Sequence, residues 1–224
     1  MEFNDIIDDM RRINTKYPHT SKPDMHYLNY DSVLELKGLI EKRENERKIN
    51  NVLKGEPDLL VSLLDIFNTG YQDSTAIPEA VIKPHFKFLG KGLIPDWFLI
   101  GKNSDGYQYI IVELKSPAEK IFYETSGGLQ FSAYCNRAMN QLLNYLTYAE
   151  RNQAFLRDEF GLGGLSNLKG LLVIGNRDDL TEKMSEQKRA WNETLSKKMT
   201  IVTWDRVKES LIEKWNFIRP DYKI

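Results

Sequence analysis

Two β-rich runs that flank a strong turn signal restrict the fold of this chain more than any other feature. Residues 97–100 and 107–114 are rich in apolar, aromatic and β-branched side chains, which is typical of strands. Between them, Lys102-Asn103-Ser104-Asp105-Gly106 ends in Asp-Gly, a pair that favours tight hairpin turns. The pattern therefore predicts an antiparallel β-hairpin whose turn is centred between Ser104 and Asp105.

Helices are expected on both sides of this hairpin. Apolar residues recur every three or four positions near the N-terminus, before Tyr17-Pro18, and in five later segments. These segments are residues 31–55, 59–67, 132–151, 181–197 and a last stretch through residues 207–212. The first of them includes alternating charges at residues 41–48, which predict a solvated helix face.

Three further strands are expected around the hairpin. Residues 80–89 alternate loosely and contain Pro84, which indicates an edge strand or a bulge, whereas residues 171–174 and 200–204 are short apolar runs. The order of helices, three strands, helix, strand, helix, strand and helix predicts an α/β fold with a mixed sheet. We expect residues 1–30 to form an N-terminal helical segment and residues 31–224 to form one domain.

Composition limits the class of protein. With 224 residues, of which 41% are hydrophobic and 28% charged, the chain is long enough to bury one sizeable core. A net charge of −1 excludes a polybasic protein that is held to its partner by bulk charge. The single cysteine, Cys135, excludes an intramolecular disulfide, and its helical context predicts a buried side chain. No apolar run reaches the roughly 20 residues of a membrane span and no secretory signal is recognisable, so a cytoplasmic protein is expected.

Two carboxylates and an ammonium group are expected to meet at one end of the hairpin. Asp96 and Glu113 are symmetric about the predicted turn centre, so they are cross-strand partners on one face, and Lys115 points the same way. Two anions this close repel each other unless a cation lies between them, and a hard divalent ion, Mg²⁺ or Mn²⁺, fits best. The alternative is that Asp96 caps a strand while the other two form an exposed edge. We favour a functional site, because Glu113 follows the apolar run Ile110-Ile111-Val112, which predicts burial on both faces.

The same residues carry a resemblance to known nucleases. Pro95-Asp96 followed by Glu113-Leu114-Lys115 resembles the PD-(D/E)xK signature in its Glu-x-Lys form. The expected order of elements is similar to the restriction-endonuclease-like core of that superfamily, αβββαβ with a mixed sheet flanked by helices. A longer stretch, roughly residues 40–213, resembles the nuclease domain of the Shedu anti-phage defence proteins. The segments that match are residues 113–117, 138–146, 172–175 and 201–205.

The resemblance implies roles for individual residues. Asp96 and Glu113 would be metal ligands, with the Leu114 carbonyl as a third, and Lys115 would contact the attacking water or the scissile phosphate. Gln141 would support the lysine or the substrate. Tyr145 would lie near the phosphate, one helical turn after Gln141, although core packing is the competing interpretation of that tyrosine.

A helical glutamate before the strands often completes such a site. Glu46 fits best and Glu56 is the rival, while an extra carboxylate such as Glu46 or Glu79 would favour two metal ions over one. For each glutamate, a salt-bridged position on the surface is the competing interpretation.

DNA is the substrate that the resemblance implies, and a homo-oligomer is also expected from it. Residues 1–75 carry more acidic than basic residues, whereas residues 76–224 carry more basic ones, and Lys87 and Lys91 are among the lysines available for phosphates. We therefore expect a metal-dependent DNA endonuclease of bacterial anti-phage defence. The alternative is a catalytically silent module on the same fold, which binds nucleic acid or a partner.

Overall fold

The structure, a computed structural model of the chain, describes residues 20–67, 74–82, 92–104, 106–160, 168–195, 197–222 and 224. The helix expected before Tyr17 lies outside the described residues, as do Lys87 and Lys91. Within the expected N-terminal segment, the described part contains a short 3₁₀ turn, Met25–Tyr27, and the start of the first α-helix.

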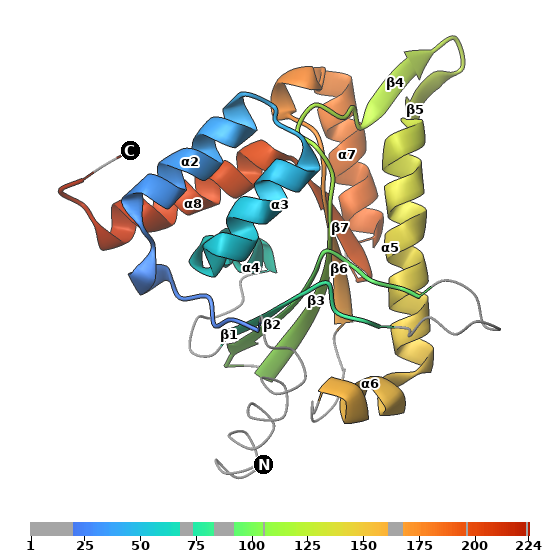
Figure 1. The fold of residues 1–224 in the computed structure, drawn as a ribbon. Coiled ribbons are helices and arrows are strands. Elements are labelled where there is room, and N and C mark those ends of the chain that lie inside the picture. The colour runs from blue at the N-terminus through green and yellow to red at the C-terminus, as the bar shows by residue number, and fades with distance from the viewer. Residues whose placement is uncertain are drawn as a thin grey trace.

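A five-stranded mixed sheet forms the centre of the fold (Figure 1). Its strand order is β1-β2-β3-β6-β7, in which the first three strands are antiparallel neighbours and β6 and β7 continue in parallel with β3. The strands are β1 (Ser74–Pro78), β2 (Trp97–Asn103), β3 (Gly106–Leu114), β6 (Leu168–Val173) and β7 (Met199–Val202). The predicted α/β class with a mixed sheet is confirmed.

The register of the β2–β3 hairpin is the one predicted from its turn. Trp97 pairs with Val112, and when this register is continued by one residue, Asp96 lies opposite Glu113. Gly106, the last turn residue, has a φ of 106°, a conformation that glycine adopts without steric cost. The local turn chemistry therefore determines which side chains meet at the far end of the hairpin.

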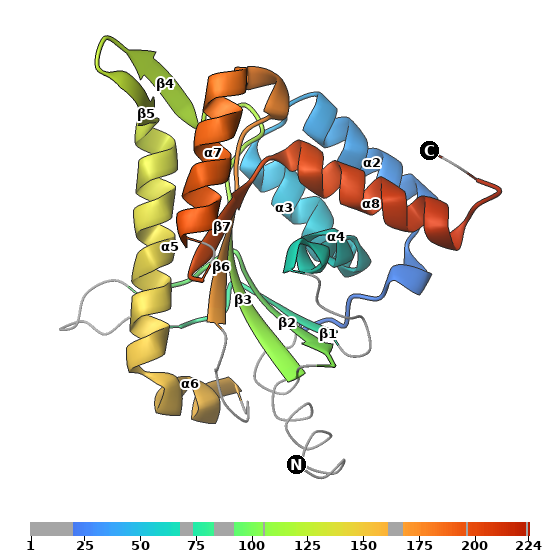
Figure 2. The same cartoon turned by 180° about the vertical axis from the view of Figure 1, so that it is seen from behind.

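Helices cover both faces of the sheet (Figures 1 and 2). One face carries α2, α3, α4 and α8, and the other carries α5 and α7, with α6 following α5. The helices are α2 (Tyr30–Glu41), α3 (Glu46–Gly55), α4 (Val61–Leu64), α5 (Ala133–Arg151), α6 (Gln153–Phe160), α7 (Glu182–Leu195) and α8 (Trp204–Ile218). Within the described ranges, no helix has both the length and the apolar character of a membrane span.

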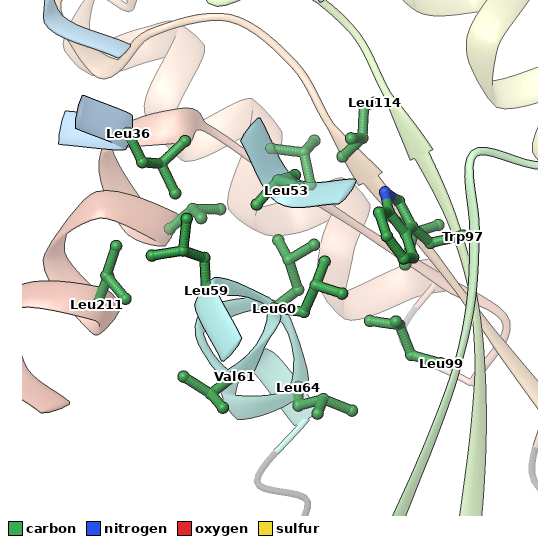
Figure 3. Close-up of a cluster of buried hydrophobic side chains, with 14 of the residues drawn as sticks. Leu36, Leu53, Leu59, Leu60, Val61, Leu64, Trp97, Leu99, Leu114 and Leu211 are labelled. Carbon is green, nitrogen blue, oxygen red and sulfur yellow. The ribbon is translucent and has the colours of Figure 1, made fainter. Parts of the chain in front are cut away.

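The apolar core consists of two clusters, one on each face of the sheet, because side chains alternate along a strand. In β3, Ile111 belongs to the cluster beneath α5 and α7, whereas Ile110 and Val112 belong to the cluster beneath α2, α3 and α8. Figure 3 shows part of the second cluster, in which Trp97 and Leu99 of β2 lie among leucines of the helices. The apolar run Ile110-Ile111-Val112 of β3 is buried on both faces of the sheet, as predicted.

Two predictions for the part before the sheet are wrong. The single helix expected over residues 31–55 is divided, because the chain turns at Arg43, whose φ is 53°, and α3 begins anew after its N-cap Asn45. The charged residues around that break have high helix propensity, so no sequence signal indicates that the helix ends there. Residues 59–67 form one α-helical turn between two 3₁₀ turns, Pro57–Leu60 and Asp65–Phe67, rather than one helix.

The strands also differ from expectation. The first strand in the described part of the chain is β1; of the strand expected over residues 80–89, the described residues 80–82 form none and residues 83–89 lie outside the described residues. An additional hairpin, β4 (Phe122–Thr125) and β5 (Gly128–Phe131), forms its own two-stranded sheet. Trp204 begins α8 instead of ending the last strand. These differences leave the predicted order of the central elements unchanged.

Candidate active site

Asp96 and Glu113 lie side by side at the end of the β2–β3 hairpin, on the face that α5 covers. Asp96 directly precedes β2, and its Oδ2 accepts a hydrogen bond of 2.7 Å from the N–H of Leu114. Glu113 is 3% exposed, and its Oε1 lies 2.7 Å from the Nζ of Lys115. The structure therefore brings the three predicted residues together and contradicts the alternative in which Glu113 lies on an exposed edge.

Burial and nearby negative charges raise the pKa values of both carboxylates. Burial raises the pKa of Asp96 to about 6, against the effect of the Leu114 hydrogen bond and with a contribution from the charge of Glu46. Burial also raises the pKa of Glu113 to about 7, and the charge of Asp96 adds to the rise. Burial disfavours the charge of Lys115, but the surrounding carboxylates outweigh it and raise the lysine's pKa. At neutral pH the site thus contains a charged lysine beside two carboxylates that ionise reluctantly.

Glu46 joins the site from α3, on the other side of the lysine. Its Oε2 lies 3.4 Å from Lys115 Nζ, although the two residues are 69 positions apart in the chain. Asn45 caps α3, which places Glu46 in the first helical turn, where the helix dipole favours a negative charge. The helix is held against β2 by a hydrogen bond of 2.8 Å from Trp97 Nε1 to Asn50 Oδ1.

The other two candidate glutamates lie elsewhere. Glu56 is exposed and forms the C-cap of α3, at the opposite end of the helix from Glu46. Glu79 accepts a hydrogen bond of 2.7 Å from Lys54 Nζ, as its interpretation as a salt-bridged surface residue expects. Of the three, Glu46 is the glutamate that reaches Lys115.

Gln141 and Tyr145 form a hydrogen-bonded pair on α5 beside the site. Gln141 Nε2 donates to the Tyr145 hydroxyl at 2.5 Å, and that hydroxyl donates to the carbonyl of Ile94 at 3.1 Å. Burial raises the pKa of Tyr145 to about 12, with a contribution from the charges of Glu113 and Asp96. The tyrosine is buried, and it anchors the backbone two residues before Asp96. In the described part of the chain, the Gln141 amide bonds this tyrosine and not the lysine.

Two residues that the sequence analysis did not single out hold the backbone around the lysine. Trp204, at the start of α8, donates from Nε1 to the Lys115 carbonyl at 2.6 Å, and the Lys115 N–H donates to the carbonyl of Val173 at 2.8 Å. Ser116 donates from Oγ to the Glu44 carbonyl at 3.0 Å, which ties the end of β3 to the loop before α3. The one signal for either residue was its place in a segment that resembles the Shedu nuclease domain, residues 113–117 for Ser116 and residues 201–205 for Trp204.

The donor set suits a hard cation that keeps water or phosphate ligands. Among the described residues, no group of three or more His, Cys, Asp or Glu side chains is close enough to enclose a metal ion. Mg²⁺ is usually bound by one or two carboxylates together with waters and substrate phosphates, so the pair Asp96 and Glu113 fits it. Their raised pKa values agree with this, since two carboxylates that repel each other favour a cation between them. The Leu114 carbonyl as a third ligand stays a prediction.

Comparison with known proteins connects this arrangement with one family. The family model described as Shedu protein SduA, C-terminal, matches residues 43–207. This range begins in the loop before α3, ends in the first turn of α8 and contains every residue that meets at the site. Comparison with curated proteins gives no match.

Proposed function

Because the chain belongs to the Shedu family, we propose that it is a metal-dependent DNA endonuclease that hydrolyses phosphodiester bonds in defence against phage. Membership in the family implies the role in defence. The order α3-β1-β2-β3-α5-β6, with an antiparallel hairpin followed by a parallel strand, supports a PD-(D/E)xK core. A homo-oligomer as the working state belongs to the same proposal.

The observation that carries the proposal is the convergence of Asp96, Glu113 and Lys115. Two buried carboxylates cost free energy, because burial and repulsion both oppose their ionisation. A fold that needed only packing at this position would be at least as stable with apolar side chains. Carboxylates with perturbed pKa values that meet a lysine at one end of a sheet are typical of catalytic sites.

Each residue of the site has its own role in the proposed hydrolysis of a phosphodiester bond. Mg²⁺ bound by Asp96 and Glu113 would neutralise charge on the scissile phosphate and lower the pKa of a bound water. Lys115 provides a positive charge where negative charge builds up during hydrolysis, and its raised pKa keeps Nζ fully protonated at neutral pH. That Nζ donates hydrogen bonds to a phosphate oxygen or to the attacking water. Glu46 and Glu113 both contact the ammonium group, at 3.4 Å and 2.7 Å from Nζ.

A catalytically silent module that binds nucleic acid or a partner is the second candidate. One observation favours it: within the described part of the chain, Asp96 and Glu113 have no third acidic, histidine or cysteine side chain close enough to complete a metal cluster. A silent module would bind DNA equally well without divalent ions.

Cleavage of supercoiled plasmid DNA tests the proposal. We expect nicked and linear products with Mg²⁺ or Mn²⁺ and none with EDTA. Lys115→Ala should lower the cleavage rate by about 100-fold or more, since it removes the cation that faces the developing charge.

Lys197→Ala is the matched control, because it removes the same charge from the exposed turn before β7, at the opposite end of the sheet. Its cleavage rate should stay within about twofold of that of the unchanged protein. DNA that stays intact with either metal ion, or equal rates for the Lys115 and Lys197 variants, would favour the silent module.

A further inference from the structure

A shallow hollow of about 380 Å³ lies between the β4–β5 hairpin, the start of α5 and the part of α7 that carries Gln187 and Trp191. Figure 1 shows this hairpin beside the ends of both helices. The hollow is lined by Phe122, Leu129, Gln130, Phe131, Asn136, Gln187 and Trp191. Its lining combines aromatic rings with carboxamides and contains no charged side chain.

Trp191 is the main aromatic surface of the hollow. It is 36% exposed, whereas the other three tryptophans of the chain are at most 5% exposed. Its ring is held by Phe131, with ring centroids 5.1 Å apart and planes at 60°, and Phe131 in turn stacks on Phe122 at 4.8 Å. A rigid indole with an open side is suited to stacking against a flat ligand.

Two of the three carboxamides around the ring are open to a ligand, whereas Asn136 Oδ1 accepts a hydrogen bond of 3.5 Å from Asn140 Nδ2. Within the described residues, no partner hydrogen-bonds the side chains of Gln130 and Gln187, and Trp191 Nε1 has no acceptor. Carboxamides offer a donor and an acceptor together, which is the pattern that the edge of a nucleobase requires. Aromatic rings surrounded by such groups are how proteins bind unpaired bases.

Along α5, Arg137 lies between Asn136, which lines the hollow, and Gln141 beside the candidate active site. It precedes Gln141 by one helical turn, so it lies on the same face of α5 as Gln141 and Tyr145. Four residues along a helix span about 6 Å, similar to the spacing of successive phosphates in a strand. Arg137 lies over the Tyr134 ring at 5.7 Å and, among the described residues, has no carboxylate partner. Its charge is therefore available for a phosphate.

We propose that this hollow binds an unpaired base of a DNA strand by stacking on Trp191, with Arg137 holding the adjacent phosphate. The inference rests on the proposed function, because it names the form of DNA that the Asp96–Glu113–Lys115 site receives: a strand that is unpaired close to the bond that is cut. Inside a duplex both faces of each base are covered by neighbouring base pairs, so duplex DNA without ends does not occupy the hollow.

Tryptophan fluorescence tests the inference without DNA cleavage. In EDTA, saturating oligothymidylate should protect the exposed tryptophan from acrylamide quenching, whereas a relaxed, covalently closed duplex, which has no terminal base pair, should not. Trp191→Ala should weaken binding of the oligothymidylate by between about 5-fold and 150-fold, the range that corresponds to loss of one stacking contact. Trp191→Phe, which keeps an aromatic ring, should stay within about threefold of the unchanged protein.

Phe217→Ala is the matched control, because Phe217 is a 75% exposed aromatic residue on α8, a helix of the opposite face. It should leave binding unchanged. Gln187→Ala removes an exposed side chain from the hollow and should weaken binding even if the Trp191 variant fails to fold.

The inference is wrong if oligothymidylate fails to bind, if bound oligothymidylate leaves the tryptophan open to acrylamide, or if the variants of the hollow bind as the Phe217 variant does. Because the measurement is made in EDTA, these outcomes are independent of plasmid cleavage. If oligothymidylate protects Trp191 but the protein never cleaves plasmid DNA, the base site is supported and the proposed nuclease function is wrong.

Discussion

At the scale of single residues, the two buried carboxylates that suit the site to bind a cation also lower the folding stability of the protein. Asp96 and Glu113 are largely removed from water and face each other across the end of a hairpin. Lys115 offsets part of their charge, but the raised pKa values show that the offset is incomplete. A protein that carries such a pair gives up folding free energy in exchange for a site that attracts cations.

Asp96→Asn should stabilise the metal-free protein above neutral pH. Because the pKa of Asp96 is raised from 3.8 to about 6, the folded state binds its proton more tightly than the unfolded state does. The free energy of unfolding therefore falls as pH rises from about 4 to about 6, and stays lower above that. Asparagine keeps an oxygen for the Leu114 N–H but carries no charge. We expect a gain of about 1–2 kcal/mol at pH 8, discounted for residual solvent contact, and a smaller gain at pH 5.

Urea unfolding in EDTA at both pH values measures this gain. Glu186→Gln is the control, because Glu186 is an exposed carboxylate on α7, and it should change the free energy of unfolding by less than about 0.5 kcal/mol. An Asp96→Asn protein that is less stable than the unchanged protein at pH 8 would show that the carboxylate contributes to folding after all.

At the scale of the elements, connections between strands and helices determine where Lys115 lies. Its carbonyl is held by Trp204 of α8 and its N–H by β6. The next residue, Ser116, accepts a hydrogen bond of 3.2 Å from the N–H of Gly175, whose own carbonyl accepts one of 3.1 Å from the Trp204 N–H. The loop after β3, the loop after β6 and the start of α8 are therefore hydrogen-bonded to one another, and Gly175 contacts both of the other segments.

Gly175→Ala should destabilise the protein by about 2–4 kcal/mol. Gly175 has a φ of 72°, which other residues adopt only with strain, and a Cβ there would lie 2.6 Å from the carbonyl oxygen of Glu119. Since that oxygen belongs to the backbone, the loop after Lys115 has to move. Thermal or urea unfolding measures the loss.

Gly38→Ala is the matched control, for which the same substitution should have the opposite effect on stability. Gly38 lies inside α2, and a Cβ there would have no atom within 4 Å, so the added methyl group should stabilise the protein by about 0.5–1 kcal/mol through helix propensity. If the two variants have equal stability, the close packing at Gly175 does not constrain the loop.

At the scale of the whole molecule, the site lies at one end of the strands β2 and β3, where residues from both helix layers come together. α3 brings Glu46 from one face, and α5 brings Gln141 and Tyr145 over the other. Both layers are built on the same strands, so binding of an ion at this end of the strands is coupled to the stability of the whole fold.

Mg²⁺ should therefore raise the melting temperature of the protein. An ion that binds only the folded state, at ten times its Kd, adds about 1.4 kcal/mol to the free energy of unfolding. The shift should be larger at pH 8 than at pH 5.5, because at the lower pH protons compete for the carboxylates, whose pKa values are about 6 and about 7. A thermal scan against Mg²⁺ concentration measures it.

Asp96→Asn should abolish most of this shift, although it raises stability without the ion. Equal shifts in the Asp96→Asn protein and the unchanged protein would place the ion elsewhere on the molecule.

The local patterns determined much of this protein. The Asp-Gly turn settled the register of β2 and β3, and with it the meeting of Asp96 and Glu113, because a hairpin register depends on a few adjacent residues. Helix spacing predicted α5 and α7 for the same reason, since each period is a property of one short segment. The break at Arg43 and the β4–β5 hairpin escaped prediction because good helix formers and weak local preferences leave the outcome to packing.

Only the tertiary structure decided which distant residues complete the site. Glu46 lies 69 positions before Lys115 and Trp204 lies 89 positions after it. The family resemblance made Glu46 a candidate and included Trp204 in a matching segment, but it did not predict that either residue contacts the lysine. The sequence favoured Glu46 over its rival Glu56 without excluding either, and the packing of α3 on β2 through Asn50 brings the first of them to the lysine. The physical reason is that local periods depend on neighbours in the chain, whereas these contacts depend on how whole helices bury their apolar faces against the sheet.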